Sequence, residues 1–259
     1  MSAPVFLADG TSLTSVASGS TYVLDGAEGR HAAVVQRKRV GERVDVVDGA
    51  GTRLRCVVAG TEGSQVRLTV EETVTEAAPG VVLTLVQALA KGDRDELAVE
   101  AAVETGVDAV VPWQAERSVV VWRGDRAARS RARWVATVRS AVKQSRRAWV
   151  PAVGDAVTTP QLAARVRDVV GAGGVALVLH EEATTPLAEA PTPEPARDGA
   201  GAPELLVVVG PEGGISDGEV RALTDAGARA VRLGPHVLRT STAGPVAVAL
   251  LSERLGRWG

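Results

Sequence analysis

The chain has 259 residues, and 45% of them are hydrophobic, which is enough for two domains that each bury a core. Its 29 basic and 31 acidic side chains give a net charge of -2, which excludes a uniformly basic nucleic-acid-binding protein. The single cysteine, Cys56, excludes an intrachain disulfide framework and a Cys/His zinc site. No apolar run is long enough to span a membrane, and the first residues have no signal-peptide pattern, so we expect a cytoplasmic protein.

Residues 1–75 have the pattern of a small domain built mostly from β-strands. The expected strands are short, rich in valine and bounded by glycine or Asp-Gly turns: Thr21–Leu24, Arg43–Val47, Arg53–Val58 and Gln65–Glu71. One helix is expected over Ala27–Arg39. Closely spaced strands with a single helix predict a small β-barrel, which ends at a hinge over Thr75–Gly80.

From residue 76 onward, expected strands alternate with helices. The strands are Val82–Leu89, Val107–Trp113, Val150–Val153, Val175–Glu181, Glu204–Gly210 and Ala228–Gly234. The helices are Asp93–Thr105, Ala127–Ser145, Gln161–Val170, Ser216–Ala226 and Ala243–Leu255. This alternation predicts an α/β domain over residues 76–259, with a parallel sheet and helices on both faces. Ala183–Pro203, which contains five prolines, is expected to be a mobile insertion with little to bury.

A glycine-rich turn follows one of these strands. Val207–Val209 leads into Gly210–Gly214, after which Ser216 and Glu219 form an S-x-x-E capping box. Ligands of open α/β sheets bind at the carboxyl ends of strands, and adjacent glycines let the backbone approach them closely. The pattern alone fits an ordinary strand-to-helix turn equally well. It is neither a Walker phosphate loop nor a dinucleotide fingerprint.

Two further strand ends carry polar groups. One strand ends in Leu233-Gly234-Pro235 and leads into a loop with one arginine and three hydroxyls: Arg239, Thr240, Ser241 and Thr242. Helix capping accounts for one hydroxyl but not for the whole group. Another strand ends in Leu179-His180-Glu181, where a purely structural histidine is the alternative. All three strand ends are expected to meet at one edge of the sheet.

With these residues the chain resembles the RsmE family, the 16S ribosomal RNA uracil-N3-methyltransferases of the SPOUT superfamily. The matching segments follow the family's order over nearly the whole chain: Arg30-His31, Val34–Arg37, Val47–Gly49, Gln87–Asp93, Glu104–Val107, Pro112, Glu116–Ser118, Gln144-Ser145, Arg147, Val150-Pro151, Gly210–Gly214 and Leu233–Thr242. The resemblance implies a PUA-like β-barrel over residues 1–75 and a SPOUT α/β domain over residues 76–259. It also implies a deep trefoil knot, which general folding rules do not predict, and a homodimer.

The same resemblance implies that the knotted loops bind S-adenosyl-L-methionine. Carried onto this chain, the cofactor-binding residues are Leu179, His180, Glu181, Gly210, Pro211, Glu212, Gly213, Gly214, Leu233, Gly234, Val237, Leu238, Thr240, Ser241, Thr242 and Ala243. No metal is expected.

A basic segment points to RNA as the partner. From Arg117 to Arg147 there are ten basic residues and one acidic residue, Asp125. Such an imbalance favours phosphate binding, although a solvated helix face is the alternative. The tryptophans that interleave with it, Trp122, Trp134 and Trp149, are expected to be core residues, with stacking on RNA bases as the alternative. The expected RNA-binding residues are Arg37, Arg39, Lys91, Arg94, Arg117, Lys143, Arg146 and Arg147. The implied partner is small-subunit ribosomal RNA, either naked or in the assembled small subunit.

The implied reaction needs a cation near the target base. When N3 of uridine loses its proton, negative charge spreads onto the neighbouring carbonyl oxygens, and a fixed cation stabilises it. Arg239 is the first candidate and Arg147 the second. Glu212 is a candidate base, or it holds backbone N–H groups of its own loop. Two other functions remain open: methyl transfer to a ribose 2′-hydroxyl, and a non-catalytic RNA-binding assembly factor.

Overall fold

The structure, a computed structural model, describes residues 3–8, 10–195 and 201–258. The chain forms two compact units, Met1–Ala78 with Val142–Val150, and Pro79–Ala141 with Pro151–Gly259. The segment Val142–Val150 therefore groups with the N-terminal unit, although the sequence pattern places it in the C-terminal domain.

The first unit contains a five-stranded sheet in the order β1-β3-β4-β5-β2. Its strands are β1 (Val5–Leu7), β2 (Thr21–Leu24), β3 (Arg43–Val47), β4 (Thr52–Glu62) and β5 (Gln65–Thr75). β1 pairs with β3 in parallel, and the other pairs are antiparallel. Alternate strand residues, among them Phe6, Val46 and Leu54, face a buried core. The four expected strands are present, and β1 was not predicted because three residues give no periodic signal.

The helix expected over Ala27–Arg39 is shorter than predicted. It consists of α1 (Gly26–Arg30) and a π-helical turn over His31–Val35. Arg37 then adopts a positive φ of 52°, a conformation that cannot continue a right-handed helix.

Polar contacts fasten the segment Val142–Val150 into the first unit. Lys143 Nζ lies 2.8 Å from Glu28 Oε1, and Arg53 donates a hydrogen bond of 2.8 Å to the Arg146 carbonyl. The indole N–H of Trp149 donates to the Glu76 carbonyl, at 3.2 Å. These contacts join residues about a hundred positions apart, so no local sequence pattern reveals them.

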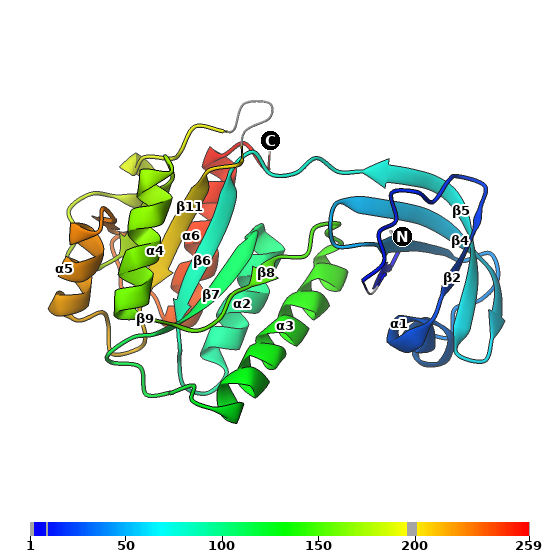
Figure 1. Cartoon of the computed structure of the whole chain (residues 1–259), viewed down its shortest axis with the longest axis horizontal. Coiled ribbons are helices and arrows are strands. Elements are labelled where there is room, and N and C mark those ends of the chain that lie inside the picture. The colour runs from blue at the N-terminus through cyan, green and yellow to red at the C-terminus, as the bar shows by residue number, and fades with distance from the viewer. Residues whose placement is uncertain (1–2, 9, 196–200, 259) are drawn as a thin grey trace. The chain divides into compact units, whose positions relative to one another are not determined.

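The second unit is a parallel sheet in the order β12-β10-β11-β6-β7-β8, with β9 also paired to β7 (Figure 1). The strands are β6 (Val82–Ala88), β7 (Ala109–Gln114), β8 (Ala152–Val153), β9 (Val157–Thr158), β10 (Val175–Leu179), β11 (Glu204–Val209) and β12 (Arg229–Val231). Every pairing within this sheet is parallel. The predicted α/β class is confirmed, and β9 is the strand that the sequence pattern did not predict.

Helices cover both faces of this sheet (Figure 1). They are α2 (Arg94–Thr105), α3 (Asp125–Ser145), α4 (Thr159–Gly171), α5 (Asp217–Asp225) and α6 (Thr240–Arg254), with α3 continuing into the first unit. α2 and α6 pack on each other and on β6, whereas α4 packs on α5 and on β10. In the described residues, no helix combines the length and apolarity needed to cross a membrane.

The segment that follows β10 packs on the second unit over residues 183–195, although the sequence pattern suggested a mobile insertion with little to bury. Leu187 and Ala190 are buried, and Leu187 lies in a short 3₁₀ turn. Arg254 of α6 donates hydrogen bonds of 2.9 Å and 2.6 Å to the carbonyls of these two residues. Residues 196–200 of the predicted insertion lie outside the described residues. The expectation of little burial was wrong because these contacts come from α6, 67 and 64 residues away in sequence.

Candidate functional site

The carboxyl ends of β10, β11 and β12 open onto a cavity of about 670 Å³ in the second unit. This volume is in the range of small-molecule sites. Every residue predicted to bind the cofactor lines it, except Ser241 and Thr242. Those two residues lie in the first turn of α6. The structure thus brings the three predicted loops together at one edge of the sheet.

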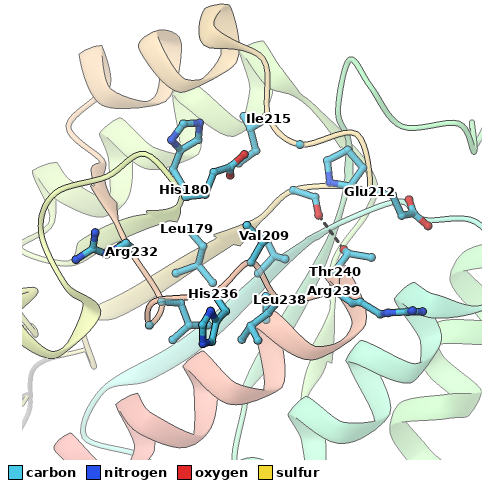
Figure 2. A pocket seen from close by; sticks show the side chains of 18 of the residues that line it. Leu179, His180, Val209, Glu212, Ile215, Arg232, His236, Leu238, Arg239 and Thr240 are labelled. Atoms are coloured by element: carbon cyan, nitrogen blue, oxygen red, sulfur yellow. Dashed lines mark hydrogen bonds between the residues drawn. The ribbon is translucent and has the colours of Figure 1, made fainter.

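The cavity has an apolar centre with polar groups on two sides (Figure 2). Leu179, Val209 and Leu238 lie in the middle of the view. Arg239 and Glu212 point to one side of them, and Arg232 lies on the opposite side. Such a cavity can enclose a flat apolar group and still present charges to a polar one.

Two glycines of the turn between β11 and α5 lie in close contact with neighbouring side chains. A Cβ atom added to Gly210 would lie 2.6 Å from Ile215 Cγ1, and one added to Gly213 would lie 3.1 Å from Arg117 Cβ. Gly214 has a φ of 73°, which favours glycine. The backbone of this turn therefore carries no side chain at these three positions, and it can approach a ligand closely.

A hydrogen-bond relay ties the cavity loops to the sheet. Gln87, fully buried at the end of β6, donates from Nε2 to Thr240 Oγ1 at 2.8 Å. Thr240 Oγ1 in turn donates to the Gly210 carbonyl at 2.8 Å. The relay connects β6, the start of α6 and the end of β11, so it fixes two of the cavity loops relative to each other.

Glu219 connects the glycine turn to two other segments. It is 4% exposed and forms the predicted capping box with Ser216 at the start of α5. Its carboxylate also accepts hydrogen bonds from the Glu116 backbone N–H at 2.8 Å and from Thr159 Oγ1 at 2.7 Å. The capping box was visible in the sequence, but the two long-range partners were not.

Replacing Glu219 with glutamine should lower the free energy of unfolding by about 1–3 kcal/mol, because the amide loses charge-assisted hydrogen bonds and one side-chain oxygen in a buried network. Asp225→Asn, at the exposed end of the same helix, is the control and should change it by less than about 0.5 kcal/mol. Urea unfolding measures both variants. Equal midpoints for Glu219→Gln and the wild-type protein would contradict the role assigned to Glu219.

Glu212 is fixed at the mouth of the cavity by two donors. Its Oε1 accepts a hydrogen bond from Arg94 Nη1 at 2.8 Å and one from the Lys91 backbone N–H at 3.1 Å. Partial burial raises the pKa of this carboxyl, but hydrogen bonds from its own backbone N–H, from Arg94 and from Lys91 outweigh burial and leave the pKa below its ordinary value. Glu212 therefore links the β11–α5 turn to the loop that precedes α2, besides bonding within its own turn.

Of the three predicted catalytic residues, Arg239 and Glu212 line the cavity and Arg147 does not. Arg239 is exposed just before α6, and within the described residues its guanidinium has no hydrogen-bond or ion-pair partner. Arg147 belongs to the first unit. Its predicted catalytic role stays a prediction.

The residues predicted to bind RNA are dispersed. Arg37 and Arg39 are exposed in the first unit, as is Arg146, whereas Lys143 is half-buried against Glu28. Lys91 and Arg94 lie beside the cavity, where both contact Glu212. Arg117 donates from Nη1 to the Gly213 carbonyl at 3.0 Å, so it fastens the glycine turn. The expected burial of the tryptophans holds for Trp134, which is 1% exposed, whereas Trp122 and Trp149 are half-buried.

Some cavity residues were not predicted. Val209, Ile215 and Arg232 each lie next to a predicted loop, and Pro235 and His236 lie inside one. An apolar residue at a strand end, such as Val209, has the same sequence pattern as any core residue. Arg94 was expected to bind RNA, and the structure places it on the cavity wall.

Comparison with known proteins identifies the family. The family described as RNA methyltransferase domain matches residues 77–252, and the RNA methyltransferase PUA domain matches residues 24–71. The chain belongs to this RNA methyltransferase family. A relative from Mycobacterium bovis named ribosomal RNA small subunit methyltransferase E is 49% identical over 93% of this chain and 89% of the relative. A Bacillus subtilis relative of the same name is 30% identical over 90% of both chains.

Solved structures of the RNA methyltransferase family have the same fold. A ribosomal RNA small subunit methyltransferase E from Neisseria gonorrhoeae, solved bound to S-adenosyl methionine, superposes with a TM-score of 0.82 at 28% identity. The match covers 98% of each chain. The fold assignment therefore holds for both units. The trefoil knot remains an inference from the family.

Proposed function

We propose that this RNA methyltransferase transfers a methyl group from S-adenosyl-L-methionine to N3 of a uridine in 16S ribosomal RNA of the small subunit. The observation that carries the proposal is the cavity at the ends of β10, β11 and β12, with the free guanidinium of Arg239 at its side. The names of the relatives and the cofactor bound to the Neisseria gonorrhoeae structure support it.

The residues of the cavity fit S-adenosylmethionine. Leu179, Val209 and Leu238 offer apolar contacts for an adenine ring. Gly210 and Gly213 leave no side chain between the backbone of the turn and a ligand. When bound, the cofactor supplies an electrophilic methyl group. The chain's own task is to hold that methyl in line with the attacking nitrogen and to exclude water.

Arg239 stabilises the charge that develops on the base. N3 of uridine attacks only after its proton has passed to water, and the negative charge is then shared by N3 and the two flanking carbonyl oxygens. A guanidinium without an internal partner can donate hydrogen bonds to such oxygens. Arg232 lies on the opposite side of the apolar centre, where it can contact S-adenosylmethionine or the RNA away from the target base.

Glu212 is a tether in this proposal rather than the base that removes the proton. Its lowered pKa means that the link to Arg94 is present above the ordinary carboxyl pKa and is lost only as the pH falls through the lowered value. Glu212→Gln should therefore leave the shape of the pH–rate profile unchanged between about pH 6 and pH 9 and reduce kcat at most about tenfold. Loss of an inflection together with a drop of about 10³-fold would assign the base role to Glu212.

The working form of the enzyme is proposed to be a cytoplasmic homodimer. Val237, in the cavity loop, and Leu250, on α6, are exposed apolar side chains that a second copy would cover. Sedimentation velocity tests the dimer, and a monomer at all concentrations would contradict it. The substrate is proposed to be 16S RNA, naked or in the assembled small subunit.

Calorimetric titration with S-adenosylmethionine separates this proposal from a non-catalytic assembly factor. Saturable one-to-one binding per chain supports the methyltransferase. An absence of binding by folded protein would favour the assembly factor, because a factor that only binds RNA needs no cofactor.

A further inference from the structure

Three arginines near the start of α3 have no internal partner. Arg123, Arg126 and Arg129 are exposed, and in the described part of the chain none of them makes an ion pair or side-chain hydrogen bond. The nearest acidic residue in sequence is Asp125. Among the described residues it forms no ion pair with Arg129, four positions later. Charge on these three side chains is therefore not used to hold the fold together.

Their placement is unfavourable for the helix itself. The N-terminal end of a helix carries a partial positive charge, so cations in its first turn destabilise it. Arg126 lies in the first turn of α3, and Arg129 follows three residues later, where like charges repel. Asp125 is the acidic residue of this first turn, and it does not pair with Arg129 among the described residues. A bound anionic partner would offset the unfavourable positive charge at the start of α3.

Other basic residues of the same segment do have internal roles, which sets the three apart. Arg131 pairs with Asp155 at 3.1 Å, and Arg133 pairs with Glu96 at 3.0 Å. Arg117 donates to the Gly213 carbonyl. The structure thus divides the basic segment into residues that fasten the fold and residues left for a partner.

The unpaired arginines lie at the same edge of the sheet as the cavity. β7 ends at Gln114, and the loop after it reaches the glycine turn through Arg117 before α3 begins at Asp125. The loop is held in place: Gln114 hydrogen-bonds the Val120 carbonyl at 2.9 Å and the Trp122 N–H at 3.2 Å. Trp122 also packs edge-on against Trp134, with 5.5 Å between ring centroids. Arg123 therefore follows an anchored residue.

We propose that Arg123, Arg126 and Arg129 form a surface that binds backbone phosphates of the ribosomal RNA beside the target nucleotide. The inference rests on the proposed function and adds to it the residues that hold the RNA outside the cavity. RNA is the partner because its phosphates supply closely spaced negative charges for the three arginines, which follow the loop that ends at the same edge of the sheet as the cavity. These arginines position the substrate, and they do not act on the reacting atoms.

The test compares two triple variants that each lose three positive charges. The first is Arg123→Gln, Arg126→Gln and Arg129→Gln. The matched control is Arg167→Gln, Arg221→Gln and Arg229→Gln, three exposed arginines in the same unit, likewise without a side-chain partner among the described residues. Filter binding to unmethylated 16S RNA, over a series of salt concentrations, gives the affinity and its salt dependence.

The first variant should bind RNA about ten- to a hundredfold more weakly at about 0.1 M salt, and the slope of log affinity against log salt should fall by about 1 per arginine. Its Tm should equal or exceed that of the wild-type protein, because Arg126 opposes the helix dipole and repels Arg129 three residues on. Wild-type affinity and slope, or a loss no larger than that of the control, would overturn the proposal. A Tm below that of the control would overturn it too, because it would give the arginines a structural role.

Kinetics separate this proposal from the methyltransferase activity on which it rests. The first variant should raise KM for RNA, keep kcat within about twofold at saturating RNA and leave the affinity for S-adenosylmethionine unchanged. A fall in kcat at saturating RNA with unchanged KM would overturn the positioning role. If neither wild-type protein nor variant produced N3-methyluridine, the proposed function would fail, while the binding data would still decide whether the arginines hold RNA.

Discussion

Replacing Arg239 with alanine is expected to lower kcat for methyl transfer by about 10²–10³-fold, the usual effect of removing one donor to a developing oxyanion. The affinity for S-adenosylmethionine should change by less than about threefold. Arg239 is exposed, and its guanidinium has no partner among the described residues, so its loss breaks no internal contact. Single-turnover rates with labelled cofactor, together with calorimetric titration, measure the two quantities separately.

Arg239→Lys serves as the conservative variant. A lysine keeps the charge but not the planar pair of donors, so it should restore part of the lost rate. A parallel loss of rate and of cofactor affinity in Arg239→Ala would contradict the electrostatic role. Arg239 would then act by shaping the loop that leads into α6.

Replacing Gly210 with alanine is expected to weaken S-adenosylmethionine binding at least about tenfold. The added Cβ would lie 2.6 Å from Ile215 Cγ1 and 3.4 Å from the Ile215 backbone nitrogen, so Ile215 must move. Ile215 lines the cavity, and Gly210 also accepts the hydrogen bond from Thr240. A shift at this point therefore displaces the wall of the cavity and disturbs the relay from Gln87. Calorimetric titration measures the effect.

Gly218→Ala, in α5, is the matched control. A Cβ there would have Ser216 Oγ as its nearest neighbour, at 3.9 Å, and alanine favours a helix by about 0.5–1 kcal/mol over glycine. The control should bind the cofactor normally and unfold at a slightly higher temperature. Normal cofactor binding by Gly210→Ala would show that the turn tolerates a side chain, and it would contradict the packing role assigned to Gly210.

Local signals in the sequence predicted much of the fold. Ser216 and Glu219 predicted the start of α5, because a capping box involves residues three apart. Gly106 predicted the end of α2, and it has the expected positive φ of 110°. Apolar runs such as Val82–Leu89 predicted buried parallel strands and, through the rule for strand ends, the edge of the sheet where the cavity lies.

The features that escaped prediction depend on contacts between distant residues. Glu219 was read as a cap, but its bonds to Glu116 and Thr159 arise only after β7 and α4 are in place. Leu187 lies in a segment that looked featureless, yet its side chain is buried. Arg254 of α6 donates a hydrogen bond to its carbonyl. A sequence pattern reports periodicity and local turn chemistry, and it contains no information about these pairings.

Nucleoside analysis of the methylated product tests whether the protein methylates N3 of a uridine in 16S ribosomal RNA. Purified protein and labelled S-adenosylmethionine would be incubated with small ribosomal subunits that lack the modification and, separately, with their naked 16S RNA. The RNA would then be digested and its nucleosides identified by mass spectrometry. We expect label in N3-methyluridine in at least one sample, and the sample that contains it identifies the form of the substrate. Label in a 2′-O-methylated nucleoside, or no label in any nucleoside while cofactor binding is intact, would contradict the account.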